Sequence, residues 1–339
     1  MLKNLASIPI RILVTGSRGK SSLVRLLQVG LSCLGMEAWG RITGVLPREV
    51  GPGGERVILR SSGGHVEEMR WWLKQVPAEA GAVVLENSAV SPELQGLAAG
   101  WLGPSLVVWT NARIDHGEIW GPGVRGAETA LLEGIPYSTP VAAGPEVACS
   151  PFVRQELEAR GCRVMSDTRK APSPEGFQAE HLRLALCALS ALGLDAEAAS
   201  PAMEQLPPDI ADFRLVESGG GILAQAFSAN DPESTAKLWE SLGWPAAETV
   251  LLYNHRPDRP ARLKSFLPWL DSLPWKERFL LGPPVFRFCD PLPLRRIRLS
   301  CADDLDRFIA LKKRVFGCGN VAGVPMSLLL AKRGDWNVA

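Results

Sequence analysis

The residues best suited to chemistry lie in one short stretch, Gly16 to Ser22, which reads GSRGKSS. Glycines at this spacing let backbone N–H groups close around an anion. Lys20 would contact the β- and γ-phosphates of a nucleotide, and the Ser21 hydroxyl would ligate Mg²⁺. Such a loop needs a strand before it and a helix after it. The apolar run 12–14 and the amphipathic run that starts at Lys20 predict both elements.

The stretch is shorter than the common phosphate-loop pattern G-x-x-x-x-G-K-[ST], because Val14 stands at the first glycine position. A glycine-rich turn followed by a surface lysine would give the same letters. The flanking strand and helix favour nucleotide binding over that alternative.

Polar residues follow two further apolar runs that read as buried strands. Glu86 ends the run 81–85, and Asp115-His116 follows the run 106–110. Ligands of parallel α/β sheets bind at the carboxyl ends of the strands, so these residues could converge on the phosphate loop. Glu86 could hold Mg²⁺, and Asp115 could orient His116 as a second metal ligand. A solvated glutamate and a surface histidine are the alternatives, and histidine is not the usual Mg²⁺ ligand.

The elements that must position these residues alternate between strand and helix. Further strands are expected at 39–43 and 57–59 with a Pro/Gly loop at 47–55 between them; helices are expected at 65–76, 91–99, 124–133 and 179–193, and a loop at 117–123. This alternation predicts a mostly parallel sheet with helices on both faces. Prolines near 201–208 mark a boundary, giving domains 1–207 and 208–339.

The second half repeats the α/β alternation. Strands are expected near 213–217, 222–227, 249–253, 279–281 and 314–317, and helices near 232–242, 260–272, 303–313 and from 323 onward. The fold class is therefore α/β, a P-loop-type domain followed by a smaller Rossmann-like domain.

Composition narrows the function classes. The 339 residues carry a formal charge of +1, and no basic run or aromatic–basic interleave supports nucleic-acid binding. Seven cysteines without a C-x-x-C pattern disfavour a disulfide framework and a zinc cage, and fit a reducing cytosol. No apolar segment reaches the ~18 residues of a membrane-spanning helix. We expect a cytoplasmic protein that is at most peripheral to the membrane through partners; its oligomeric state is not readable.

Taken in order, these strings resemble the Mur ligase superfamily, whose members join a carboxylate to an amine using ATP. The branch most similar is the ligase subunit of poly-γ-glutamate synthases (CapB/PgsB type). The strings that carry the resemblance are IPIRILVTGSRGKSS, RITGVLPR, VVLENSAVSPELQ, TNARIDHGEIWGP, AFSANDPEST, YNHRPDR and GCGNVAG. They span nearly the whole chain, and the short phosphate loop is that superfamily's form.

The resemblance implies a role for each matched residue. ATP would be bound by Gly16, Ser17, Arg18, Gly19, Lys20, Ser21, Ser22, Asn230, Asp258 and Arg259. Mg²⁺ would be held by Ser21, Glu86 and His116. The catalytic residues would be Lys20, His116 and Arg214. Substrate binding is expected at Arg41, Thr43, Arg48 and Arg113. The three arginines could bind substrate carboxylates, because guanidinium groups match carboxylate geometry; solvated arginines are the alternative.

The resemblance also implies substrates and partners. Glutamate would be added in γ-linkage to a growing poly-γ-glutamate chain through an acyl phosphate, with membrane-bound synthase subunits as partners. Two departures from many relatives stand out: residues 117–136 contain no lysine to be carbamylated, and Gln225 replaces an aspartate. These departures keep open the alternative of a non-catalytic ATP-binding subunit. The phosphate loop taken alone keeps open a second alternative, a P-loop kinase or NTPase of another class.

Overall fold

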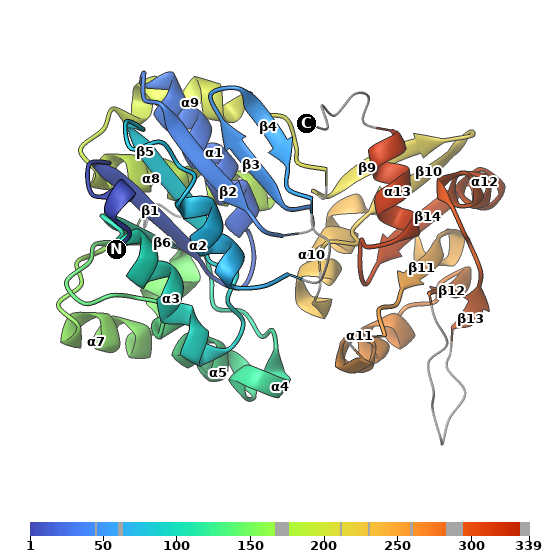
Figure 1. Ribbon diagram of the computed structural model, residues 1–339. Coiled ribbons are helices and arrows are strands. Elements are labelled where there is room, and N and C mark those ends of the chain that lie inside the picture. Colours follow the sequence, from blue (N-terminus) through green and yellow to red (C-terminus); the bar gives the residue numbers. More distant parts are fainter. Residues whose placement is uncertain are drawn as a thin grey trace. The chain divides into compact units, whose positions relative to one another are not determined.

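The computed structural model describes residues 1–44, 46–59, 64–166, 176–210, 212–229, 231–257, 260–282 and 294–332. The chain divides into two compact units, one from Met1 to Pro207 and the other from Pro208 to Trp336. Each unit is a layered α/β structure with a sheet between helices (Figure 1). The predicted α/β class of both halves is thereby confirmed. The assignment of residues 1–207 to a central ATP-binding domain and of residues 208–339 to a C-terminal ligase domain stays a prediction.

The sheet of the first unit has eight strands among the described residues, in the order β4-β3-β2-β5-β1-β6-β7-β8. The strands are β1 (Ile10–Thr15), β2 (Ala38–Ile42), β3 (Arg48–Gly51), β4 (Gly54–Val57), β5 (Ala82–Glu86), β6 (Leu106–Trp109), β7 (Val141–Ala143) and β8 (Val164–Met165). Strands β2, β5, β1, β6, β7 and β8 pair in parallel, whereas β3 and β4 continue the sheet antiparallel from β2.

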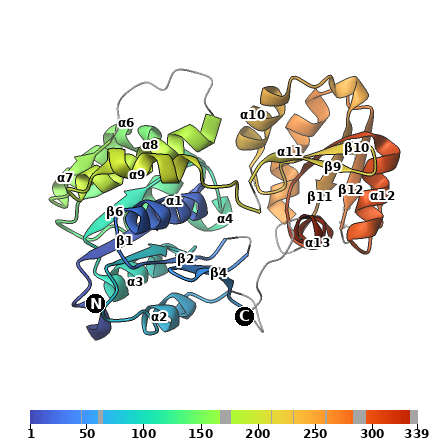
Figure 2. The same ribbon diagram turned by 90° about the horizontal axis from the view of Figure 1, so that it is seen from above.

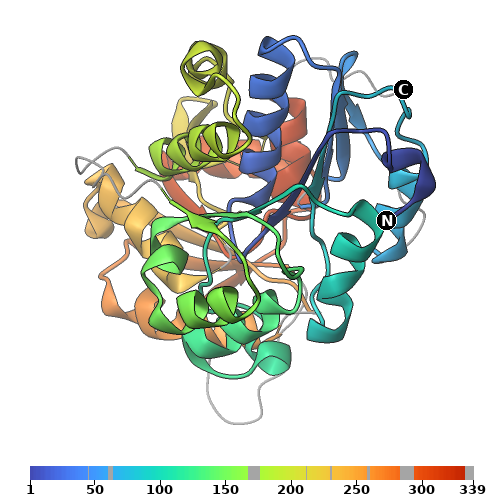
Figure 3. The ribbon, with the colours of Figure 1, turned by 90° about the vertical axis from the view of Figure 1, so that its left-hand side faces the viewer.

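Helices cover both faces of this sheet (Figure 3). The helical segments are the 3-10 helix η1 (Lys3–Leu5), α1 (Lys20–Cys33), α2 (Glu67–Leu73), α3 (Pro92–Leu102), α4 (Gly117–Trp120), α5 (Gly123–Leu132), α6 (Pro145–Cys149), α7 (Pro151–Ala159), α8 (Gly176–Ala191) and α9 (Ala196–Glu204). Helices α1, α8 and α9 pack on one face around one apolar core, and α2, α3, α5 and α7 pack around a second core on the other. Strand β1 serves both cores, because Ile12 and Val14 face one and Leu13 faces the other. This explains its uninterrupted apolar run.

The sheet of the second unit has six strands among the described residues, in the order β13-β12-β11-β14-β10-β9. Its elements are β9 (Arg214–Ser218), β10 (Gly221–Gln225), α10 (Pro232–Leu242), the 3-10 helix η2 (Ala246–Glu248), β11 (Val250–Asn254), α11 (Pro260–Ser272), β12 (Glu277–Leu281), β13 (Arg295–Ile297), α12 (Ala302–Lys312), β14 (Arg314–Cys318) and α13 (Val324–Ala331). Only β9 pairs antiparallel within the described part. Helices α10 and α11 cover one face, and α12 and α13 cover the other (Figure 2).

Two expectations about local structure were wrong. The expected loop 47–55 and strand 57–59 are instead the hairpin β3–β4, which turns at residues 52–53 and ends at Val57. The expected loop 117–123 contains the short helix α4. Both stretches are rich in Gly, Pro and charged residues, a composition that resembles loops when only the sequence is read. Among the described helices, none is long and apolar enough to cross a bilayer.

Candidate functional site

The phosphate loop joins β1 to α1 through two glycines with positive φ. Gly16 has φ +129° and Gly19 has φ +79°, a backbone range that side chains disfavour. A Cβ on Gly16 would also lie 2.0 Å from Thr110 Oγ1 at the end of β6. Gly16 is therefore required both by its backbone angle and by the close approach of the neighbouring strand.

The backbone N–H groups best placed for an anion lie at the start of α1. The first four N–H groups of a helix have no acceptor inside it, and in α1 these belong to Gly19, the N-cap, and to residues 20–22. The N–H groups of Ser17 and Arg18 are used differently: they donate to the main-chain oxygen and the Oδ1 atom of Asn111, at 3.1 and 3.0 Å. We therefore expect a phosphate group over residues 19–22.

Lys20 folds back over this loop. Its Nζ donates to the Gly16 carbonyl oxygen at 2.5 Å and lies 3.5 Å from the Ser17 carbonyl oxygen. Burial lowers the pKa of Lys20 from its usual value, against the opposing effect of the Glu86 carboxylate. The ammonium group is thus held by weak neutral acceptors, which an arriving phosphate would replace with a stronger partner.

Ser21, Thr43 and Glu86 meet at the carboxyl end of the sheet. Ser21 Oγ donates to Glu86 Oε2 at 3.1 Å, and the Thr43 N–H donates to the same oxygen at 2.9 Å. Glu86 is only 3% exposed. A hydroxyl and a carboxylate at this spacing are oxygen donors of the kind that Mg²⁺ prefers, so this pair fits a divalent metal beside the phosphate loop.

His116 adopts φ +47°, and its ring packs 5.1 Å from that of Trp120, centroid to centroid. Asp115 Oδ2 lies 3.5 Å from His116 Nε2 but only 3.1 Å from Arg18 Nη1. Burial alone would raise the pKa of Asp115, but the charges of Arg18 and His116 outweigh it and lower that pKa. Asp115 therefore links the His116 loop to the phosphate loop through Arg18.

No group of three or more His, Cys, Asp or Glu side chains suited to a metal occurs in the described part of the chain. The metal roles of Ser21, Glu86 and His116 stay predictions, and any ion there would take further oxygens from the nucleotide and water.

Two predicted substrate arginines are deeply buried in ion pairs. Arg41 and Arg48 are each 1% exposed. Arg41 Nη2 lies 2.8 Å from Glu68 Oε2, and Arg48 Nη1 lies 2.7 Å from Glu55 Oε2. A substrate carboxylate would have to compete with these internal partners. The substrate-binding roles of Arg41 and Arg48 stay predictions.

Arg113 lies closer to the phosphate loop. Its main-chain oxygen accepts a hydrogen bond from Ser17 Oγ at 2.8 Å, and its guanidinium pairs with Glu146 at 2.7 Å. Thr43 contributes its N–H to Glu86, as described above. The substrate-binding roles of Arg113 and Thr43 stay predictions.

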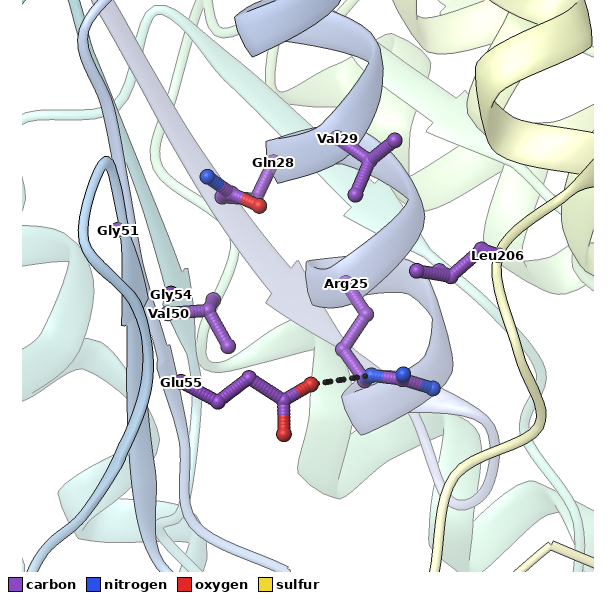
Figure 4. Close-up of a pocket in the computed structure, with 8 residues that line it drawn as sticks. All are labelled: Arg25, Gln28, Val29, Val50, Gly51, Gly54, Glu55 and Leu206. Atoms are coloured by element: carbon purple, nitrogen blue, oxygen red, sulfur yellow. Dashed lines mark hydrogen bonds and ion pairs between the residues drawn. The ribbon is translucent and has the colours of Figure 1, made fainter. Parts of the chain in front are cut away.

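A separate pocket lies on the flank of α1, between that helix and the β3–β4 hairpin (Figure 4). It has a volume of about 190 Å³. Arg25, 4% exposed, stands at its edge, where its Nε bonds Glu55 Oε1 at 3.0 Å and its Nη1 bonds the Pro207 carbonyl oxygen at 3.1 Å. The lining is mostly apolar and contains none of the residues of the phosphate-loop site; it consists of Arg25, Gln28, Val29, Val50, Gly51, Gly54, Glu55 and Leu206.

Comparison with known proteins points to one family. Residues 211–333 match the family model described as the poly-gamma-glutamate synthase CapB C-terminal domain. The PGA synthase CapB of Bacillus subtilis (strain 168) is 26% identical over 363 residues, covering 96% of this chain and 91% of that protein. The chain resembles CapB. The resemblance expected from the motifs is confirmed.

The fold of this CapB-like chain also matches solved structures of folylpolyglutamate synthases. E. coli FolC in complex with ADP superposes with a TM-score of 0.71 at 18% identity, covering 98% of this chain and 92% of that one. A bifunctional folylpolyglutamate synthase/dihydrofolate synthase with Mn, AMPPNP and L-glutamate bound gives 0.69 at 15% identity, covering 97% and 90%. At these identities the likeness concerns the fold alone.

The predicted site residues of the second unit are only partly described. Asn230, Asp258 and Arg259 lie outside the described residues. Arg214 begins β9 and donates through Nη2 to the Ile210 carbonyl oxygen at 2.6 Å. Its predicted role toward the phosphates of a CapB-like enzyme stays a prediction.

The sequence reading missed His181, which α8 places on the phosphate loop. A Cβ on Gly19 would lie 2.2 Å from His181 Nε2, so the imidazole packs directly against that glycine. Burial, with a smaller effect of Arg113, lowers the pKa of His181 to about 4. The only signal in the sequence was a histidine near the start of a helix whose second half is apolar, and nothing local tied it to residue 19.

Proposed function

We propose that this chain is an ATP-dependent carboxylate–amine ligase that adds glutamate in γ-linkage to a poly-γ-glutamate chain. The observation that carries the proposal is the meeting of the phosphate loop, Lys20 and the Ser21–Glu86 pair at one sheet edge. The similarity to the PGA synthase CapB and to the poly-gamma-glutamate synthase CapB C-terminal domain supports the substrate class.

The chemistry follows from the weakness of a carboxylate as an acylating group. A carboxylate oxygen of the chain end attacks the γ-phosphorus of ATP, the bond to the β-phosphate oxygen breaks, and ADP leaves. The glutamate amine then attacks the acyl phosphate carbon, phosphate leaves, and the nitrogen loses a proton to give the amide. Lys20 and the N–H groups of residues 19–22 would stabilise the charge on the transferring phosphoryl group.

We propose Mg²⁺ as the divalent ion. A structural neighbour contains Mn with a nucleotide analogue, which supports a divalent metal in this fold. Ser21 and Glu86 would hold it, because their oxygens already lie 3.1 Å apart at the phosphate loop. When bound, the ion neutralises negative charge on the β- and γ-phosphate oxygens.

The substrate and partner proposals rest on the relatives. The glutamate in one neighbouring structure supports glutamate as the incoming amine. Membrane-bound synthase subunits, and a place on the cytoplasmic side of the membrane, are proposals that follow from the similarity to CapB.

The experiment is ADP release from ATP and Mg²⁺, with and without glutamate and a short γ-glutamate oligomer, for the parent and for Lys20→Ala and Glu86→Ala. We expect release that depends on glutamate and oligomer, is lost in both variants, and is matched by an equal amount of lengthened oligomer. Arg154→Ala serves as the control, because this exposed residue of α7 lies outside the site.

Each alternative gives its own result. ADP release that ignores amino acids would indicate an NTPase, and a phosphorylated product would indicate a kinase. Tight ATP binding without turnover, even with membranes that contain partner subunits, would indicate a non-catalytic subunit.

A further inference from the structure

Two side chains at the end of β6 hold both backbone polar groups of Arg18. Asn111 Oδ1 accepts from the Arg18 N–H at 3.0 Å, and Asn111 Nδ2 donates to the Arg18 carbonyl oxygen at 3.3 Å. Thr110 Oγ1 donates to the same carbonyl oxygen at 2.6 Å. Thr110 and Asn111 are 2% and 3% exposed, so water competes little for these bonds.

The same segment fixes the residues on either side of Arg18. The Thr110 N–H donates to the Thr15 carbonyl oxygen at 3.0 Å, which ties the end of β6 to the end of β1. The Ser17 N–H donates to the Asn111 carbonyl oxygen at 3.1 Å. Residues 110–111 are therefore hydrogen-bonded to both Ser17 and Arg18, in the first half of the phosphate loop.

Asn111 lies at the carboxyl end of the sheet, where ligand-binding residues usually lie, but its amide bonds the backbone of Arg18. One lone pair on Oδ1 and one N–H of Nδ2 are used on Arg18, so the amide is oriented by the loop. It also withdraws the Arg18 N–H from anion binding. The N–H groups at the start of α1 are left for the phosphate.

We infer that Thr110 and Asn111 are positioning residues that hold the phosphate loop in its anion-binding shape before the nucleotide arrives. Without them the glycine-containing loop would sample many conformations, and binding would have to order it. Pre-organisation of this kind raises affinity without any contact to the ligand. The inference extends the proposed function and uses a nucleotide only as a probe.

The first test is the affinity for ADP, measured by calorimetry on the full chain. We expect Asn111→Ala to weaken ADP binding about tenfold, because it removes two bonds to Arg18. Thr110→Val, which keeps the shape but lacks the hydroxyl, should weaken binding about fivefold. Thr110→Ser restores a hydroxyl and should bind within about twofold of the parent.

Asn4→Ala is the matched control for a purely structural loss. Asn4 Nδ2 donates to the carbonyl oxygens of Leu73 and Val76 at 2.8 and 3.2 Å, away from the phosphate loop. This variant should lower the melting temperature and leave the ADP affinity unchanged. We call the hold of Thr110 and Asn111 on Arg18 the clamp. The clamp is refuted if Asn111→Ala binds ADP as tightly as the parent, or if Asn4→Ala weakens binding equally.

A second measurement does not depend on any ligand. Hydrogen exchange of peptides covering residues 16–20 should be slow in the parent and at least about tenfold faster in Asn111→Ala, with helix α3 unchanged. If the parent fails to bind ADP while this difference is seen, the proposed function fails and the clamp stands. If exchange of the loop is the same in both proteins, the clamp is wrong whatever the chain binds.

Discussion

The Ser21 hydroxyl donates to the Glu86 carboxylate at 3.1 Å, although 65 residues separate them in the chain. The contact follows from the pairing of β1 with β5, which places Val14 opposite Glu86 just before the phosphate loop begins. The next strand, β2, adds the Thr43 N–H to the same carboxylate oxygen. Three segments thus fix one carboxylate beside the loop.

Glu86→Gln should lower the rate of glutamate-dependent ADP release about 100-fold. The amide keeps the size and an oxygen for the Thr43 N–H but loses the charge that a divalent ion needs. The rate should be measured over a range of Mg²⁺ concentrations. Glu128→Gln, another buried glutamate of the same unit, should stay active. Equal losses in the two variants would argue against a metal role.

Lys20→Met should lower the rate of glutamate-dependent ADP release about 1,000-fold without unfolding the protein. Burial lowers the pKa of Lys20, so removing its charge relieves a desolvation cost. Urea unfolding should show a change in stability within about 1 kcal/mol. Lys74→Met, at an exposed lysine, should change neither quantity. A stable variant with parent-like turnover would contradict the role of Lys20.

Acidification should destabilise the parent through His181. Its pKa falls from 6.5 in the unfolded chain to about 4 in the fold, so the unfolded state binds the proton first. The contribution of neutral His181 to the free energy of unfolding is present above pH 6.5 and is lost as the pH falls toward 4. Between pH 7 and pH 5 this amounts to about 2 kcal/mol. Urea unfolding at both pH values should show a smaller loss for His181→Asn; identical losses would refute the prediction.

Glu55→Ala should lower the free energy of unfolding by about 2 kcal/mol, because two buried arginines, Arg25 and Arg48, both pair with this carboxylate. The figure is below that of a fully buried pair, since Glu55 is 24% exposed. Glu67→Ala, which removes a surface pair with Arg70, should cost less than about 0.5 kcal/mol. Similar costs for the two variants would mean that the cluster contributes little.

The residues that were easiest to predict from the sequence are those at the carboxyl ends of strands. Lys20, Ser21 and Glu86 follow apolar runs of the kind that form central parallel strands, and parallel strands bring their carboxyl ends to one edge. The β3–β4 hairpin was missed because buried ion pairs give its strands charged residues, such as Arg48 and Glu55, in place of an alternating apolar pattern.

The contact of His181 with Gly19 could not be predicted for a different reason. It depends on how α8 packs beside α1, and side-chain packing between helices distant in sequence leaves no local pattern. The hydrogen bonds between the Asn111 amide and the Arg18 backbone could not be predicted for the same reason. The motif predicted polar residues near the loop but not which atoms they would bind.

In the sheet of the first unit, the strands that carry the phosphate-loop site lie in the interior, and the β3–β4 hairpin lies at one edge. The phosphate loop follows β1, Glu86 is the last residue of β5, and Thr110–Asn111 follow β6. These three strands are neighbours in the interior of the sheet, with further strands on both sides. The β3–β4 hairpin, by contrast, forms one edge, and its turn at Gly53 is exposed. Extra sequence inserted at that turn would extend a margin of the sheet and leave its interior strands paired as they are. The fold can therefore accept a reporter or an affinity handle there while the phosphate loop keeps its shape.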